Sequence, residues 1–184
     1  MAPDHPEEAV MPRAALTLLA LMTIVPPLAA DPAPDPWAAW THLLGDWQSA
    51  NPPEQGQGHF SFAPDLGGKV LIRRHVTDLP ATEARPAQHH EDLLVVYPAA
   101  DGAPYRAMYF DNEGHVIAYR AEVAADGRTV TLTSDPGPGP RFRLTYLLPA
   151  EGPATVRFEI APPGRPEGFT TYLEGKAVRK ADAR

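Results

Sequence analysis

The chain has 184 residues, of which 43% are hydrophobic and 21% are charged, and its formal net charge is -7. This length is typical of one globular domain, and the acidic balance argues against a nucleic-acid-binding protein, which needs a basic face. The 23 prolines disfavour a protein built from long helices and favour a chain with many turns.

An apolar segment near the start of the chain, AALTLLALMTIVPPL, covers residues 14–28 and follows Arg13. Its length is typical of a secretory signal peptide, and it is too short, with two prolines inside, for a membrane-spanning helix. Residues 1–10 contain acidic side chains and no Lys or Arg, which is unusual ahead of such a segment. A start at Met11 would instead place Arg13 just before the apolar run.

These features predict a signal peptide over residues 1–30, with the true start at Met11, then a linker over 31–36 and one domain over 37–180. The alternative is an uncleaved membrane anchor. The chain has no Cys, so neither disulfides nor a lipid-modified Cys is available. We therefore expect a periplasmic or extracellular protein with no membrane span after cleavage.

The first predicted element is a short helix that begins after Asp35 and Pro36, since Asp caps free N–H groups and Pro suits the first helical position. Four residues then follow at helical spacing, and Gly45 is a natural stop. The four are Trp37, Trp40, Thr41 and Leu44.

After Gly45 the apolar residues alternate with polar ones, which is the pattern of half-buried strands. The predicted strands cover residues 46–50, 57–63, 70–77, 92–97, 105–111, 115–124, 128–134, 141–148, 155–161 and 169–179. Short turns rich in Gly, Pro, Asp and Asn separate them, and none has room for a crossover helix. The fold class predicted is therefore all-β: an antiparallel up-and-down β-barrel of about ten strands with a short N-terminal helix. A β-sandwich would give the same alternation.

The Gly45-Asp46-Trp47 motif leads from the predicted helix into the first strand, and the last strand carries Arg179. With the meander of antiparallel strands, this layout resembles the calycin superfamily of lipocalin-like barrels. The resemblance implies that Gly45 and Trp47 are structural residues that close one end of the barrel, with Arg179 lying across the indole. Ten strands are closer to the fatty-acid-binding and nitrobindin-like branches of that superfamily than to eight-stranded lipocalins.

Two arginines in apolar strands are candidate ligand-binding residues. Alternation places one of the adjacent Arg73 and Arg74 on the inner face without deciding which, and it is Arg74 if Val70 and Ile72 face inward. Arg106 lies in a strand whose two faces are both apolar. A buried Arg requires a carboxylate partner, from the protein or from a ligand. Fatty-acid-binding barrels, which the chain resembles, hold a carboxylate with an interior Arg and a Tyr hydroxyl. Tyr109 and Tyr119 are the tyrosines available for that role here.

His115 is a further candidate because alternation places it on the same face as Tyr119, near the mouth of the barrel. An inward His can donate to a polar ligand or ligate haem iron, the latter as the nitrobindin-like resemblance implies. The segment QHHED at residues 88–92 is predicted to be a polar loop and not a metal site. In an extended chain His89 and His90 point to opposite faces, and no Cys is available.

No motif of a nucleophilic, metal-dependent or phosphate-binding enzyme is present in the sequence. We therefore predict a binding protein rather than an enzyme, without cofactor or metal, holding a small hydrophobic or amphipathic molecule inside the barrel. Three alternatives remain: a hydrolase or isomerase using His115, a haem-binding protein, and a structural envelope protein with a filled core.

Overall fold

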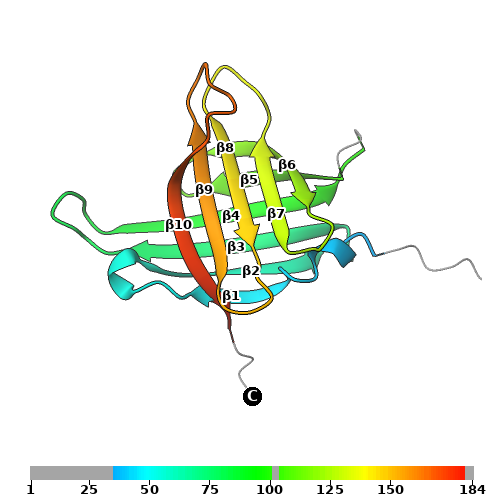
Figure 1. Ribbon diagram of the computed structural model, residues 1–184, viewed down its shortest axis with the longest axis horizontal. Helices are drawn as coiled ribbons and strands as arrows, with labels where there is room; N and C mark the ends of the chain where they lie inside the picture. The colour runs from blue at the N-terminus through cyan, green and yellow to red at the C-terminus, as the bar shows by residue number, and fades with distance from the viewer. Residues whose placement is uncertain (1–34, 101–103, 181–184) are drawn as a thin grey trace, which may run out of the picture. The chain divides into compact units, whose positions relative to one another are not determined.

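The computed structural model describes residues 35–100 and 104–180, which form one closed antiparallel β-barrel (Figure 1). Ten strands follow one another around the barrel in chain order, and the last pairs with the first. The strands are β1 (Gly45–Ser49), β2 (Gln57–Asp65), β3 (Val70–Leu79), β4 (Gln88–Pro98), β5 (Tyr105–Asp111), β6 (Val116–Val123), β7 (Thr129–Ser134), β8 (Arg141–Leu147), β9 (Ala154–Ala161) and β10 (Thr170–Arg179). The predicted fold class is confirmed.

The only helical segments among these residues are two 3-10 turns, η1 (Ala38–Trp40) and η2 (Pro53–Gln55). The predicted N-terminal helix is therefore a single turn. Its start has the expected chemistry, because the backbone N–H of Trp37 donates to Asp35 Oδ1 at 2.9 Å. No described helix is long and apolar enough to cross a membrane. The predicted signal peptide and most of the predicted linker lie outside the described residues.

The start of β4 differs from the sequence prediction. Residues 88–92 are not a loop but the first half of a strand, paired with β3 from Leu79↔Gln88 to His75↔Asp92. Alternation along the strand places His90 and Asp92 on the inner face and His89 on the outer face. The loop prediction is wrong because the polar residues of this segment do not all face solvent: His90 is half-buried and Asp92 is buried.

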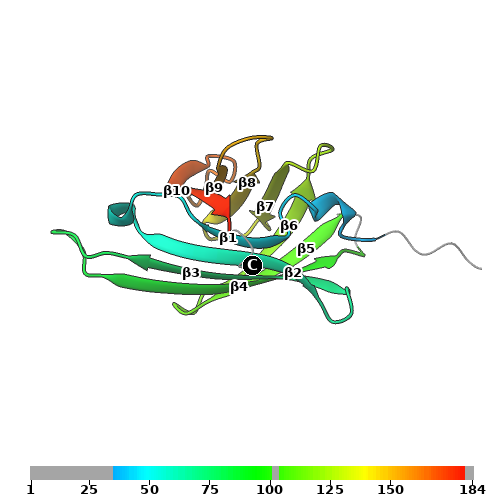
Figure 2. The same cartoon turned by 90° about the horizontal axis from the view of Figure 1, so that it is seen from below.

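The barrel is flattened into two layers, with β1 to β4 in one and β7 to β10 in the other (Figure 2). Apolar residues on the inner faces of both layers fill the space between them in one half of the barrel. Seven of them are at most 1% exposed: Phe62, Leu71, Leu94, Val96, Val130, Leu132 and Tyr146. Burial of this apolar area is the main force that holds the two layers together.

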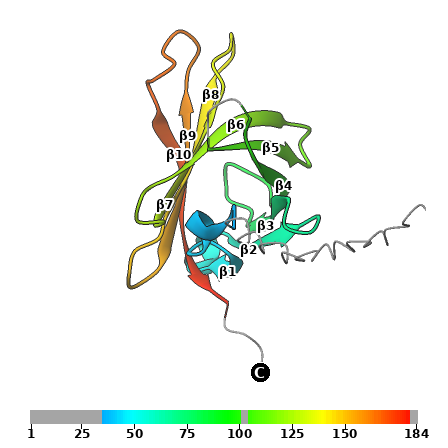
Figure 3. The ribbon, with the colours of Figure 1, turned by 90° about the vertical axis from the view of Figure 1, so that its right-hand side faces the viewer.

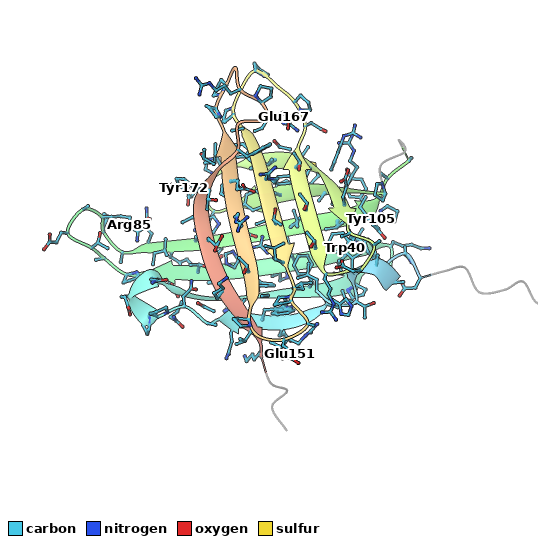
Figure 4. The ribbon with its side chains drawn as sticks, in the orientation of Figure 1. Trp40, Arg85, Tyr105, Glu151, Glu167 and Tyr172 are labelled. Carbon is cyan, nitrogen blue, oxygen red and sulfur yellow. The ribbon has the colours of Figure 1, made fainter. Side chains whose placement is uncertain are left out.

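Residues 36–44 cross one end of the barrel, between the two layers, and close it (Figure 3). Trp37, Trp40 and Leu43 are at most 2% exposed. The Trp37 indole N–H donates to Gly68 O at 2.8 Å, and the Tyr105 hydroxyl donates to Pro36 O at 2.7 Å. Trp40 and Tyr105 meet edge to face, with ring centroids 5.3 Å apart (Figure 4). This end is called the closed end below.

The Gly45-Asp46-Trp47 motif lies at the closed end, where β1 pairs with β10 and places Trp47 opposite Arg179. The Arg179 guanidinium carbon is 4.6 Å from the centroid of the Trp47 ring, the arrangement implied by the resemblance to calycins. Its two terminal nitrogens donate to Leu44 O and His42 O at 2.6 and 2.7 Å. Arg179 therefore ties the closing segment to the last strand.

Replacing Gly45 by Ala should lower the free energy of unfolding by about 1–3 kcal/mol, because an L-residue is strained at its backbone angle. Gly45 has φ of +103°, and an added Cβ would lie 3.0 Å from Arg179 Nη1. Urea denaturation of the two proteins measures the difference. Gly137→Ala is the matched control, since φ is not positive there and a Cβ meets nothing within 4 Å. Equal losses in the two variants would contradict the structural role of Gly45.

Candidate functional site

The end of the barrel opposite the closed end, called the distal end, carries a cluster of polar side chains on its inner face. The cluster comes from three adjacent strands, β3, β4 and β5, and we refer to it as the polar wall. It consists of Arg73, His75, His90, Asp92 and Tyr109. Their inward orientation follows from the register, since His75 lies opposite Asp92 in the β3–β4 pair and β5 continues the same face.

Arg73 and Asp92 form a buried ion pair at the base of the polar wall. Arg73 Nη1 donates to Asp92 Oδ1 at 2.8 Å, and the two side chains are 5% and 3% exposed. The guanidinium carbon is also 5.9 Å from the centroid of the Phe60 ring and 6.0 Å from that of the Tyr146 ring. Burial alone would raise the pKa of Asp92, but the charge of Arg73 and hydrogen bonds from both histidines hold it well below its ordinary value.

Two imidazoles converge on the second oxygen of the same carboxylate. His75 Nδ1 donates to Asp92 Oδ2 at 2.7 Å, and His90 Nε2 lies 3.4 Å from that oxygen. The other nitrogen of each ring also has a partner. Thr77 Oγ1 lies 2.6 Å from His75 Nε2, and Glu113 Oε1 lies 3.1 Å from His90 Nδ1. Both ring orientations are therefore held from two sides.

The two imidazoles differ in their protonation. Burial and the charge of Arg73 lower the pKa of His75, so that its imidazole is neutral at neutral pH. The carboxylate of Asp92, together with that of Glu113, raises the pKa of His90. The polar wall thus combines one neutral imidazole and one that gains a proton more readily.

Tyr109 extends the polar wall toward the turn between β5 and β6. Its hydroxyl donates to Asp111 Oδ2 at 3.2 Å and lies 3.2 Å from His90 Nε2. Burial, with the nearby carboxylates of Asp92 and Asp111, raises the pKa of Tyr109, so the phenol remains protonated. Tyr119 lies next to it on the inner face, with ring centroids 6.5 Å apart, but is only 1% exposed. Tyr109 is thus accessible from the distal end, whereas Tyr119 belongs to the core.

His115 does not face the interior, which corrects the sequence prediction. Its side chain is 59% exposed, and Nδ1 bonds to Asp111 Oδ2 at 2.8 Å across the β5–β6 turn. The reason is that β6 begins only at Val116, so His115 belongs to the turn and the alternation used to place it does not apply. A haem ligand or a general base inside the barrel at His115 is therefore not supported.

The two candidate arginines also face outward. Arg74 is exposed, and its neighbour Arg73 is the buried residue of the pair, so the inner parity of β3 is that of Leu71 and not of Ile72. Arg106 Nη1 donates to both carboxylate oxygens of Asp135, at 2.9 and 2.7 Å, on the outer face. The carboxylate expected for an interior Arg is the protein's own Asp92.

Across the barrel from the polar wall, β8, β9 and β10 present aromatic rings at the distal end. Phe142 and Phe158 stack with centroids 5.9 Å apart, and Tyr172 meets Phe158 edge to face at 6.3 Å. We call these three residues the aromatic ladder. A bulge between Thr171 and Leu173 interrupts the pairing of β10 there, and Tyr172 is 66% exposed (Figure 4).

The wall of the barrel is incomplete beside the aromatic ladder. β1 pairs with β10 only from Ser49↔Ala177 to Trp47↔Arg179, so within the described part of the chain residues 170–175 have no strand on that side. Leu173, which lies opposite Phe158, is accordingly 55% exposed. The inner face beside these residues is therefore not covered by a described strand at the distal end.

Two surface hollows lie elsewhere, on the outside of the barrel. One, of about 310 Å³, is lined by Arg120, Glu122, Asp135 and Arg141, among others. The second, of about 410 Å³, lies between the β1–β2 and β3–β4 connections and includes Asp78 and His89. Charged and polar side chains predominate in the first hollow, the second is also lined by Pro53, Leu79, Pro80 and Ala87, and no residue of the polar wall lines either of them.

The sequence pointed to Tyr109 and left open which of Arg73 and Arg74 faces inward, but it gave no role to His75, His90 or Asp92. The signal was present: the alternation of His90, Asp92 and Leu94 matches a strand whose inner face becomes apolar toward its end. This alternation was not recognised because adjacent polar residues are also typical of a loop.

A scan against protein-family models matches no family, and a search of the curated proteins finds no match to this chain.

Proposed function

We propose that the protein binds a small amphipathic molecule at the distal end of the barrel. The observation that carries the proposal is the pairing of two unlike inner surfaces at this end. The polar wall offers hydrogen-bonding groups that are partly exposed, since the side chains of His75 and His90 are 21% and 25% exposed. The aromatic ladder offers apolar area facing it, β4 and β9 being five strands apart in the ring of ten.

The chemistry of the two surfaces suggests how such a molecule lies. Its apolar part packs on Phe158 and Tyr172, where burial of apolar area drives binding. Its polar part meets His90 and the Tyr109 hydroxyl. The head group need not be a carboxylate, because Asp92 already neutralises the one buried guanidinium of the polar wall. The sequence-based expectation was that an interior Arg and a Tyr hold the carboxylate of a ligand. In the proposed site the interior Arg is already paired, so no ligand carboxylate is required.

We further propose that the chain is a distant calycin that acts after export. The calycin proposal is supported by the closed ten-stranded barrel with the Arg179 guanidinium over Trp47. The export proposal is supported by the apolar segment at residues 14–28, which follows Arg13, and by the absence of Cys from the chain.

Replacing Tyr172 by Ala is expected to weaken binding of the fluorescent probe N-phenyl-1-naphthylamine about threefold to tenfold. The reason is that loss of one aromatic contact costs about 0.5–1.5 kcal/mol. A fluorescence titration of the full chain measures the dissociation constant. Because Tyr172 is exposed, its removal should leave the fold intact.

Phe110→Ala is the matched control, since Phe110 is also an exposed aromatic residue, at 39%, but it lies on the outer face of β5. Its dissociation constant should equal that of the wild type. Absence of saturable probe binding, or equal weakening by both substitutions, would rule out the distal end as the binding site.

A further inference from the structure

We propose that His75, His90 and Asp92 form a site for a divalent transition-metal ion such as Zn²⁺. One donor atom from each residue lies within 4.8 Å of the other two. The atoms facing the common centre are His75 Nδ1, His90 Nε2 and Asp92 Oδ2, with Oδ2 at 2.7 and 3.4 Å from the two nitrogens. Donors around a tetrahedral zinc stand about 3.3–3.6 Å apart, given bonds of about 2.0–2.2 Å. Small outward shifts of these side chains would admit the ion.

The hydrogen-bond partners of the two imidazoles are of the kind found around metal-binding histidines. A metal-binding imidazole usually donates its other N–H to an oxygen, which fixes the orientation of the ring. Here Thr77 Oγ1 lies 2.6 Å from His75 Nε2, and Glu113 Oε1 lies 3.1 Å from His90 Nδ1. With the ion bound, both outer nitrogens would carry their protons and donate to these oxygens.

Asp92 is oriented in the same way. Its Oδ1 accepts from Arg73 Nη1 at 2.8 Å, which leaves Oδ2 to face the two imidazoles. The positive charge of Arg73 opposes a nearby cation, whereas the carboxylate of Glu113 and that of Asp111, which bonds to Tyr109, favour it. The surrounding charge is therefore compatible with a doubly charged ion.

The chemistry of the donors selects the kind of ion. Two imidazoles and one carboxylate suit Zn²⁺ and its transition-metal neighbours, whereas Mg²⁺ and Ca²⁺ prefer sets made only of oxygens. Three protein ligands also leave at least one coordination position for water or for a polar group of a bound molecule. The site is reachable, since both imidazoles keep part of their surface in contact with solvent.

The inference does not depend on the small-molecule function, because the metal alone is the probe. The experiment is isothermal titration of the metal-free full chain with ZnCl₂, together with the visible spectrum of the Co²⁺-loaded protein. We expect one saturable equivalent of Zn²⁺ and the d–d bands of tetrahedral Co²⁺. His75→Gln and His90→Gln should each weaken Zn²⁺ binding at least tenfold and abolish those bands.

His89→Gln is the matched control. His89 is adjacent in sequence but lies on the outer face, where its ring bonds to Asp78 and Glu91. This variant should bind Zn²⁺ as the wild type does, and circular dichroism checks that all three variants are folded. The inference is overturned if the wild type binds no stoichiometric Zn²⁺, if His90→Gln binds it unchanged, or if His89→Gln loses as much affinity. Failure of the naphthylamine titration with normal zinc binding would reject only the small-molecule function.

Discussion

Replacing Asp92 by Asn is expected to lower the free energy of unfolding by about 3–5 kcal/mol, because it leaves the buried charge of Arg73 without a counter-charge. Both side chains are at most 5% exposed, so water cannot compensate. Asn has nearly the same shape as Asp, so the loss reports the charge and not a cavity. Urea denaturation followed by circular dichroism measures it.

The double variant Arg73→Met/Asp92→Asn is the control, because it removes both charges. It should recover most of the lost free energy, since an uncharged pair has no uncompensated buried ion. If Asp92→Asn alone is within about 1 kcal/mol of the wild type, or if the double variant is no better, the ion pair is not the strongly coupled unit described above.

The same carboxylate also makes stability depend on pH in a defined direction. The folded-state pKa of Asp92 lies below its unfolded value of about 3.9, so its contribution is present above that pH. The contribution is lost as the pH falls and the unfolded state takes up a proton that the folded state does not. Between about pH 5 and pH 3 the wild type should therefore lose more free energy of unfolding than Asp92→Asn does.

Replacing Trp40 by Ala is expected to lower the free energy of unfolding by about 3–5 kcal/mol, the usual cost of deleting a buried Trp. Trp40 is 0% exposed at the closed end and contacts the rings of Trp37, Phe62 and Tyr105. Loss of the indole would leave a cavity among these three rings. Thermal and urea denaturation give the size of the effect.

Trp40→Phe is the matched comparison for Trp40→Ala. The Trp40 indole N–H has no hydrogen-bond partner among the described residues, so Phe loses ring area but no hydrogen bond and should cost far less. Since Trp40 closes the end away from the polar wall, zinc and probe binding by folded Trp40→Ala should match those of the wild type. A large loss of binding would show that the two ends are coupled.

Much of the fold was predictable because each strand carries its own signal. Phe142, Leu144 and Tyr146 alternate with polar residues, and in the barrel Leu144 and Tyr146 are buried while Phe142 packs against the core. The wrong predictions fall at two kinds of position. At His90 the strand alternates, but its inner face there has no apolar residue that would reveal the alternation. At His115 the residue belongs to a turn, so alternation does not apply.

The choice between Arg73 and Arg74 shows the limit of such reasoning. Val70, Leu71 and Ile72 are all apolar, so both parities of β3 satisfied the pattern. Pairing decides between them, because Arg73 lies opposite Phe62 on β2 and Leu94 on β4, both of which are fully inside. An inner position for Arg73 is then stable only because the same register sets Asp92 within reach.

By itself the sequence determined the all-β class and the strand order, because alternation and turn residues are local properties of the chain, whereas the packing of Arg179 on Trp47 was expected only from the resemblance to calycins. Only the tertiary structure decided the polar wall. His75 and Asp92 are 17 residues apart in the chain, yet their side chains are 2.7 Å apart. Their contact depends on the register of β3 with β4, and a shift of one residue would turn one of them to the opposite face.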